Sequence, residues 1–551
     1  AARIESLDRV VLAMALREQY KYIPAAIGTL TLVSVVALEY LFILQLNHGV
    51  FVYTLDDPYI HLALAENIRL GHYGINLEEA SAPSSSILWP FLIAPFAGFE
   101  PGPLLLNLLA ALASVVVLGA VLNLSLPLAE ARQRLLLHSV LAVLFIFATN
   151  LIGLVFTGME HSLQVLLVML IGYGLLREAD SGEVKPWLLL ALIAAPLVRY
   201  ECLSVSLAGL GFLLLRRHWR AVLTVAPAIG LLLVAFSLFL LSLGLDPYPT
   251  SVAAKSSVVH SGGALGSVFW NLKTALFDER QGIVMAAATL PLLGYYLLAQ
   301  DPVRRQLALV TLLAVALHYA VGRFNWYNRY EIYIWAFMLV VSIYLFAPGV
   351  QRIIRSQPRG LAATLVLVVA LGLYASAGYV YGLYILPLAS NNIYEQQYQM
   401  HKFATDFHAG PVAVNDLGYV AYKNDHYVLD LWGLGSKQAF ERRTGGEDPG
   451  WMQAITREHG VDLVMIYEGW FEEVPATWIK LGELALGKRD ITAARTRVAF
   501  LATRPQAVPS LHKQLQQFAR SLPQGVRFHF QTHPQDSSVA ARMESSLPSP
   551  K

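Results

Sequence analysis

Long runs of apolar residues dominate the first 386 positions of the chain. A membrane-spanning helix needs about 20 such residues, or somewhat fewer when charged side chains at its ends reach the interface. The pattern predicts spans at 24–46, 102–125, 135–156, 161–176, 186–199, 201–215, 221–243, 281–299, 306–322, 331–348 and 360–386. Residues 87–99 are also apolar, but Pro90, Pro95 and Gly98 interrupt them. We therefore expect that segment to be re-entrant or interfacial rather than a crossing.

The pattern changes after about residue 388, where short apolar runs alternate with helical periodicity. Residues 411–418 are predicted to form a strand that runs into a turn, further strands are predicted at 427–432, 461–467 and 496–501, and helices at 394–408 and 450–459. Strands interleaved with helices indicate a small α/β domain. Residues after about 532 are rich in Ser, Pro and Gln, a composition typical of a segment with little structure.

Composition supports this division of the chain. Of its 551 residues, 56% are hydrophobic and only 14% are charged, whereas a soluble domain carries about 25% charged residues. The predicted fold class is an α-helical polytopic membrane protein with a C-terminal extracytoplasmic α/β domain. The predicted domains are a cytoplasmic amphipathic N-terminus (1–23), a membrane module (24–386) with a first outer loop (47–86), the α/β domain (387–531) and a flexible tail (532–551).

Charge and cysteine content exclude some functions. The net charge of +2 gives no reason to expect a nucleic-acid partner. The single cysteine, Cys202, excludes an intrachain disulfide and a cysteine-rich metal site. Residues 1–22 resemble a mixed-charge amphipathic helix and not a signal peptide.

Basic residues predict the orientation, because cytoplasmic loops of membrane proteins carry an excess of Lys and Arg. With the N-terminus in the cytoplasm, the inner loops would be those that contain arginine clusters: 132–134, 177–185, 216–220, 304–305 and 352–359. The turns that carry Asp56, Glu160, Lys255 and Arg329 would then all lie outside, provided that 87–99 does not cross. The α/β domain would also be extracytoplasmic.

Asp56 and Asp57 stand side by side in the segment Tyr53-Thr-Leu-Asp-Asp-Pro-Tyr-Ile-His61, close to the first apolar run. Carboxylates near hydrocarbon are costly unless water, a partner or a substrate meets them. A helix is predicted to begin at about Tyr59, which would place the pair at its N-terminal end, where an ionised carboxylate is favoured. Such a carboxylate suits a general base, and a plain helix cap beside a solvated turn is the alternative.

Four further outer turns carry polar residues. Lys255 could hold a phosphate or reach lipid headgroups. Glu160 could contribute its carboxylate to a site or could only cap a helix. Arg199 and Glu201 could pair with each other, whereas Arg329 lies among aromatic residues that suit either an interface or an anion site. Together these turns predict a composite site near the lipid boundary for an anionic ligand such as a lipid phosphate.

Several of these segments together resemble the GT-C superfamily of polytopic glycosyltransferases, and within it the terminal arabinofuranosyltransferase group. The motifs are spread over about residues 24–386. They are Leu55-Asp-Asp-Pro-Tyr-Ile-His61, Ala65-Glu-Asn-Ile-Arg69, Gly71-His-Tyr-Gly74, Ser84-Ser-Ser-Ile-Leu-Trp89, Gly158-Met-Glu160, Arg199-Tyr-Glu201, Pro249 to Lys255 and Arg329-Tyr330. Pro58, and the lack of an Asn beside Pro249-Thr-Ser, depart from the nearest pattern.

The resemblance implies an inverting transfer of a sugar, such as a pentose, from a polyprenyl-phosphate donor to a glycan, glycolipid or protein acceptor. It implies that Asp56 is the catalytic base and that Asp57 supports it. The implied donor-phosphate ligands are Lys255, Arg199, Arg329 and His61, and the candidate substrate contacts are Glu160, Glu201, Tyr330, Asp416, Asp430 and Trp432. Some members of the superfamily bind a divalent cation near the acidic pair; no further ligand set stands out here, so no metal is assigned.

Two other classes remain open at this stage. A transporter or flippase of a lipid-linked sugar would place ionisable residues near the midplane and often shows two repeated halves. No repeat is visible, and most charges collect at one face, which favours the enzyme. A membrane scaffold with a partner-binding domain is the third reading. The enzyme would lie in the cytoplasmic membrane, with its active site on the extracytoplasmic side.

Overall fold

The computed structural model describes residues 21–252, 263–325, 327–445 and 450–531. The chain divides into two compact units. The helical unit contains residues up to Thr54, Ile68–Gly71 and Ser84–Pro387, and the α/β unit contains Leu55–Asn67, His72–Pro83 and the chain from Leu388 onward. The predicted N-terminal helix, apart from residues 21–23, the tail and Lys255 lie outside the described residues.

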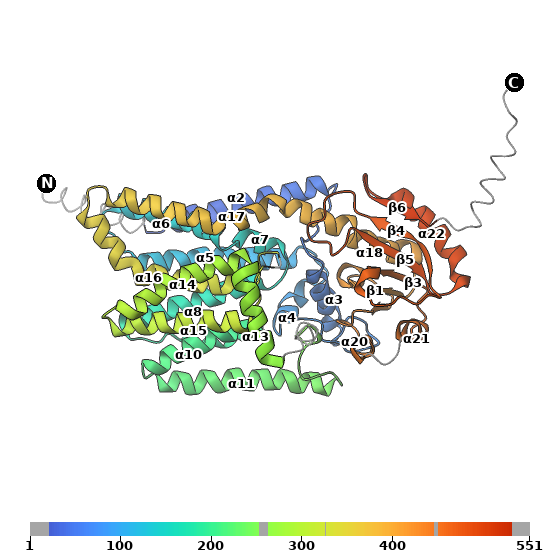
Figure 1. The fold of residues 1–551 in the computed structure, drawn as a ribbon, viewed down its shortest axis with the longest axis horizontal. Helices are drawn as coiled ribbons and strands as arrows, with labels where there is room; N and C mark the ends of the chain where they lie inside the picture. Colours follow the sequence, from blue (N-terminus) through green and yellow to red (C-terminus); the bar gives the residue numbers. More distant parts are fainter. Residues whose placement is uncertain (1–20, 253–262, 326, 446–449, 532–551) are drawn as a thin grey trace, which may run out of the picture. The chain divides into compact units, whose positions relative to one another are not determined.

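Apolar helices build the helical unit (Figure 1). Among the described residues, eight helical segments are long and apolar enough to cross a membrane. Seven of them are the helices α2 (Ile23–Leu46), α5 (Gly102–Ser125), α6 (Ala131–Ala148), α8 (His161–Ser181), α11 (Trp219–Ser242), α14 (Arg280–Leu298) and α16 (Ile332–Ser356). The eighth starts with α17 (Gly360–Glu395) and continues into the short helices that follow it. The others are α4 (Trp89–Ile93), η1 (Ala94–Phe96), α7 (Leu151–Phe156), α9 (Pro186–Val198), η2 (Tyr200–Cys202), α10 (Leu203–Leu215), α13 (Gly263–Lys273), η3 (Thr274–Asp278) and α15 (Pro302–Val321).

The exposed apolar surface of these helices identifies a membrane protein. On α11, Leu223, Leu231 and Leu238 expose 72%, 70% and 60% of their surface. Soluble proteins rarely expose contiguous apolar surface of this kind, because water contact with it is unfavourable. Hydrocarbon is the environment that satisfies such a helix.

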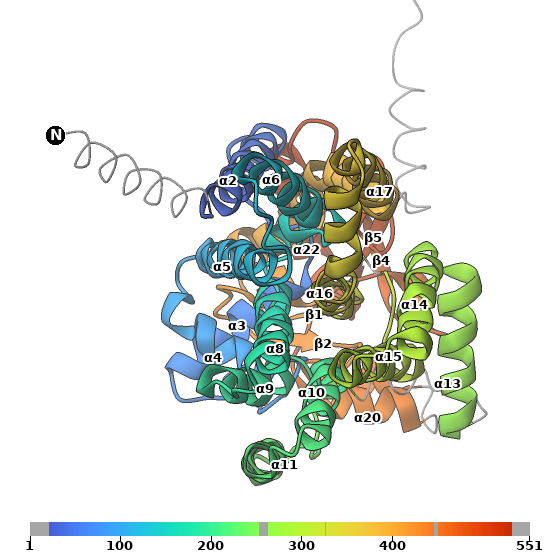
Figure 2. The same cartoon turned by 90° about the vertical axis from the view of Figure 1, so that its left-hand side faces the viewer.

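Helix α8 lies at the centre of the helical unit and packs against α5, α9 and α16, as the end-on view shows (Figure 2). Glycines permit this close approach: a Cβ atom at Gly172 would lie 3.0 Å from Val340 Cγ1, and one at Gly174 would lie 2.8 Å from Leu188 Cδ1. Small residues are a common device for packing membrane helices, where no hydrophobic driving force holds helices together.

Some predicted boundaries differ from the structure. The predicted span 135–156 is broken at Asn150, whose φ of 47° is left-handed, into α6 and α7. The predicted span 360–386 is part of a 36-residue helix that continues to Glu395. The segment 87–99 forms only the five-residue α4 and the three-residue η1, which are too short to cross a bilayer.

A six-stranded mixed sheet forms the core of the α/β unit. Its order is β2-β1-β3-β5-β4-β6, in which β1 pairs in parallel with β2 and β3 and the remaining pairs are antiparallel. The strands are β1 (Val412–Val414), β2 (Val428–Asp430), β3 (Leu463–Ile466), β4 (Ile479–Ala485), β5 (Arg497–Ala502) and β6 (Arg527–Phe530). The helices are α18 (Gln397–Lys402), η4 (Phe403–His408), α19 (Gly418–Ala421), α20 (Lys437–Gly445), α21 (Trp451–Glu458), η5 (Glu468–Trp470), η6 (Pro505–Ala507) and α22 (Val508–Ser521).

The predicted fold class, a helical membrane part with a C-terminal α/β domain, is confirmed. All four predicted strands are present, but β4, β6 and α22 were not predicted. Charged residues explain the omission of β4, because Lys480 and Glu483 interrupt its apolar pattern and pair with each other. The predicted helix 394–408 is divided among the end of α17, α18 and the π-helical η4.

Part of the first predicted outer loop belongs to the α/β unit. It contributes α3 (Asp57–Arg69) and the stretch that follows. Asn76 pairs with the backbone of Val428 through both amide atoms, at 2.9 and 3.0 Å. The ring centroid of Tyr59 lies 3.9 Å from that of Tyr419. These contacts join residues about 350 positions apart in the sequence, so sequence neighbourhood could not reveal them.

Candidate functional site

The carboxylate of Asp56 is held by the backbone of the α/β unit. Its Oδ2 accepts a hydrogen bond from Gly418 N at 2.7 Å, and its Oδ1 accepts one from Tyr419 N at 2.8 Å. The side chain is 7% exposed. Position 418 needs glycine, since a Cβ atom there would collide with the carbonyl oxygen and the carboxyl group of Asp56. The expected helix α3 does begin at Asp57, but the donors to Asp56 come from the start of α19 instead.

The topology of the sheet explains why polar residues gather near Asp56. Strands β2, β1 and β3 are parallel neighbours, so their carboxyl ends lie at one edge, where α/β proteins commonly place their sites. Asp430 ends β2, Asp416 follows β1 and Tyr467 follows β3. Gln397 links two of them: its Nε2 donates to Asp416 Oδ2 at 2.7 Å and lies 3.1 Å from the Tyr467 hydroxyl.

Burial and neighbouring carboxylates raise the pKa of the acidic side chains at this edge of the sheet. Burial raises the pKa of Asp56, the carboxylate of Asp416 raises it further, and the two backbone donors partly oppose the shift. Burial also raises the pKa of Asp416 to about 6, against the hydrogen bond from Gln397. A carboxyl group whose pKa approaches neutrality is suited to exchange protons at physiological pH.

Asp57 and His61 lie on α3 beside this cluster. Asp57 is partly exposed, unlike Asp56, and its charge raises the pKa of both Asp56 and Asp416. His61 is buried, with 3% of its surface exposed. Its role as a phosphate or sugar ligand stays a prediction.

Asp430 and Trp432, the other candidates in the α/β unit, are engaged locally. The carboxylate of Asp430 accepts hydrogen bonds from Trp432 N at 2.9 Å and Gly435 N at 2.8 Å, which closes the loop after β2. The Arg443 guanidinium lies 4.0 Å from the centroid of the Trp432 ring. We interpret Asp430 as a loop-stabilising residue, whereas Trp432 remains a candidate contact for an acceptor.

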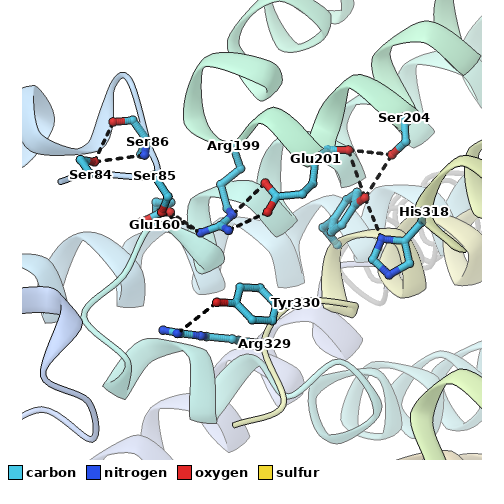
Figure 3. Close-up of polar contacts among 11 residues, drawn as sticks. Ser84, Ser85, Ser86, Glu160, Arg199, Glu201, Ser204, His318, Arg329 and Tyr330 are labelled. Atoms are coloured by element: carbon cyan, nitrogen blue, oxygen red, sulfur yellow. Dashed lines mark hydrogen bonds and ion pairs between the residues drawn. The ribbon is translucent and has the colours of Figure 1, made fainter. Parts of the chain in front are cut away.

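A second cluster lies in the helical unit and centres on Arg199 (Figure 3). Its Nη1 donates to Glu160 Oε1 at 2.6 Å, and its Nη2 and Nε donate to the two oxygens of Glu201 at 2.8 and 3.2 Å. Nη1 also reaches Ser85 Oγ at 3.3 Å. Arg199 and Glu160 are 2% and 0% exposed. The arginine charge is thus already compensated, which argues for a structural role rather than for phosphate binding.

The backbone of Glu201 continues this cluster into the helices. The Tyr333 hydroxyl donates to Glu201 O at 3.0 Å, and Ser204 Oγ donates to the same oxygen at 2.8 Å. His318 Nδ1 lies 2.9 Å from the Tyr333 hydroxyl. In Figure 3, separate dashed lines join His318 and Ser204 to this one hydroxyl. The network fixes the break between α9 and α10, where the chain leaves the helical conformation at Arg199.

Tyr330 joins the remaining candidates to Arg199. The guanidinium groups of Arg199 and Arg329 lie 5.5 and 5.1 Å from its ring centroid. Both distances fall within the range of a cation–π contact. The structure therefore brings together Glu160, Arg199, Glu201, Arg329 and Tyr330, which the sequence predicts to lie on one side of the membrane.

A third polar cluster forms where the arginine-rich segment 216–220, predicted to be an inner loop, meets Glu178 at the end of α8. Glu178, fully buried, accepts hydrogen bonds from Arg216 Nε at 3.0 Å and lies 2.7 Å from His218 Nε2. Helix α8 connects this cluster to the one at Glu160, and 18 residues at 1.5 Å each separate the two glutamates by about 27 Å. That spacing is close to the thickness of a bilayer core, about 30 Å. The polar residues thus lie at two levels consistent with two membrane interfaces.

Sequence reasoning missed the residues that position the acids. Gln397, Gly418, Tyr467, Tyr333 and His318 were not predicted. The turn at the end of 411–418 was predicted from its Asn, Asp and Gly residues, but nothing in it indicated that Gly418 would meet Asp56. Within the described ranges, no group of three or more His, Cys, Asp or Glu side chains is arranged to hold a metal ion.

Comparison with known proteins gives limited matches. Residues 391–501 match a family model described as a domain of unknown function, DUF8728. No curated protein matches the sequence. Among solved structures, the Archaeoglobus fulgidus oligosaccharyltransferase in its apo form is similar, with a TM-score of 0.41 and 12% identity over 88% of this chain and 78% of that one. The Archaeoglobus fulgidus enzyme AglB in complex with an inhibitory peptide and a dolichol-phosphate has a TM-score of 0.40 and 13% identity over 88% and 77%.

Proposed function

We propose that this protein is an inverting glycosyltransferase that uses a polyprenyl-phosphate sugar. The donor sugar is a pentose such as arabinofuranose, and the acceptor is a hydroxyl of a cell-envelope glycan, glycolipid or protein on the extracytoplasmic side. The observation that carries the proposal is the Asp56–Asp57 pair, in which Asp56 is oriented by two backbone donors among carboxylates that raise its pKa. The motif resemblance and the apolar helices support it.

In this mechanism Asp56 accepts the proton of the acceptor hydroxyl. The oxygen then attacks the anomeric carbon as the bond from that carbon to the phosphate oxygen breaks, and polyprenyl phosphate leaves with inversion. Each carboxylate oxygen of Asp56 accepts one backbone hydrogen bond and keeps a second lone pair for the proton. Asp57, which is partly exposed, would contact the acceptor.

The leaving phosphate would be neutralised by Lys255 and Arg329. Charge that develops on a leaving group is stabilised by cations placed in advance, commonly the largest electrostatic contribution to catalysis. We keep Arg329 in this role and not Arg199, because Arg199 already bridges Glu160 and Glu201.

The test is transfer of radiolabel from polyprenyl-phosphate arabinofuranose to a cell-envelope fraction by the full-length protein in lipid nanodiscs. We expect Asp56→Asn to lower the rate by about 100-fold to 10,000-fold, the usual contribution of a general base. Asp425→Asn, at an exposed position in the α/β unit, is the matched control and should turn over normally.

Three outcomes would contradict parts of the proposal. Normal turnover by Asp56→Asn would exclude Asp56 as the base. Loss of turnover in Asp57→Asn alone would move that role to Asp57. Passage of the lipid-linked sugar across the bilayer, with no cleavage of its phosphate bond, would favour a transporter.

A further inference from the structure

A single turn after β1 acts on Asp56 in two ways. The turn from Asp416 to Tyr419 supplies the two N–H groups that hold the Asp56 carboxylate. It also supplies a second carboxylate, that of Asp416, two residues before Gly418, and the charge of that carboxylate raises the pKa of Asp56. The orientation of Asp56 and its electrostatic surroundings are therefore set by the same four residues.

Asp416 is itself held in a fixed position. Gln397 Nε2 donates to its Oδ2 at 2.7 Å, and the same amide lies 3.1 Å from the Tyr467 hydroxyl. Gln397 is 1% exposed and Tyr467 is 2% exposed. A buried amide fixed on two sides leaves Asp416 little freedom to turn away from Asp56.

The groups that face this pair make double ionisation unfavourable. Asp57 on α3 and Asp430 at the end of β2 add like charge. The Tyr467 hydroxyl donates to Gln396 Oε1 and accepts from Gln397 Nε2, so it neutralises neither acid. Two neighbouring carboxylates in a buried place resist ionising together, which favours the retention of one proton by the pair.

We propose that Asp416 is a positioning residue that shares one proton with Asp56 and so completes the proton-accepting site from the α/β unit. This inference rests on the proposed role of Asp56 as the base. During transfer, Asp56 accepts the proton of the acceptor hydroxyl while the shared proton moves onto Asp416, which leaves both carboxyl groups protonated until one proton returns to water. The raised pKa values of both groups agree with this sharing.

An infrared titration of the full-length protein in nanodiscs tests the shared proton without using a substrate. The wild type should show a protonated carboxyl band at pH 7 that Asp56→Asn removes and that titrates at lower pH in Asp416→Asn, while Asp425→Asn leaves it unchanged. Gln397→Met provides a variant that retains both acids. It should move the band's titration to higher pH, because the hydrogen bond from Gln397 lowers the pKa of Asp416. A band that persists unchanged in Asp416→Asn would overturn the proposal.

The pH dependence of kcat/KM gives the second measurement. Removing the like charge at position 416 should move the acid limb of the profile to lower pH by about one unit or more. A merely structural residue would lower the rate equally at every pH, and that result would also overturn the shared proton. Turnover by Asp56→Asn would instead refute the proposed function and leave the infrared result standing.

Discussion

Gly418 N donates a hydrogen bond to Asp56 Oδ2 across 362 positions of sequence. The contact requires the backbone of residue 418 to approach the carboxyl group more closely than any side chain would allow. The backbone of a residue that has no side chain therefore orients Asp56.

Gly418→Ala should therefore displace Asp56. A methyl group at this position would meet the carbonyl oxygen and the carboxyl group of Asp56, so one of them must shift. We expect transfer to fall by about 100-fold, the usual effect of a misplacement of about 1 Å at a reacting group. Gly469→Ala is the control, because a Cβ atom there has open space. Equal activity in the two variants would mean that the contact does not position Asp56.

Arg199→Met should destabilise the helical unit. The substitution leaves Glu160 buried without its partner, and breaking a buried ion pair in this way costs about 3–5 kcal/mol. Thermal unfolding of the purified protein in lipid nanodiscs measures the loss. The double variant with Glu160→Gln should recover part of the stability, because the unpaired charge is removed. A double variant as unstable as the sum of the two single variants would show that the two side chains are not coupled.

Stability should depend on the charge of Asp416. Its pKa is about 6 when folded, against 3.8 ordinarily, so its contribution to stability is present below about pH 4 and is lost as pH rises through 6. Asp416→Asn cannot ionise and should gain stability relative to wild type over this window, by at most about 3 kcal/mol. Unfolding temperatures measured from pH 4 to pH 7 check the prediction. A gain that is the same at every pH would contradict it.

Glu178→Gln should lower stability and spare the chemistry. The substitution weakens the hydrogen bonds from Arg216 and His218, which we expect to cost about 1–3 kcal/mol. Since Glu178 lies about 27 Å along α8 from Glu160, transfer per folded molecule should stay unchanged. A fall in specific activity beyond the loss of folded protein would contradict this separation.

The sequence predicts the helical part well because its signal is local. Apolar runs of about 20 residues mark α2, α5 and α11 within one or two residues of their ends. The break at Asn150 was missed, since both sides of it are equally apolar and only a left-handed residue marks it. The strands with alternating charge, such as β4, were missed for the opposite reason: polar residues mask a buried face.

The candidate site was predicted in part. The motifs identify Asp56 and Asp416 separately, one beside a span and the other at a strand end. Their association depends on Gly418 and Gln397, whose roles lie in backbone approach and side-chain packing and leave no periodic trace in the sequence. The pairing of Arg199 with Glu201 was an open alternative in the sequence, and the structure shows it.

The order in which the chain is synthesised gives the anchoring of Asp56 a biological consequence. Asp56 leaves the ribosome more than 350 residues before the donors that hold it. Throughout that interval the apolar helices can insert while the acidic loop has no partner from the turn at 416–419. A chain truncated before Gly418 retains the eight described helical segments that could cross a membrane but lacks the two donors, so Asp56 can be held in this way only after the turn at 416–419 has been synthesised.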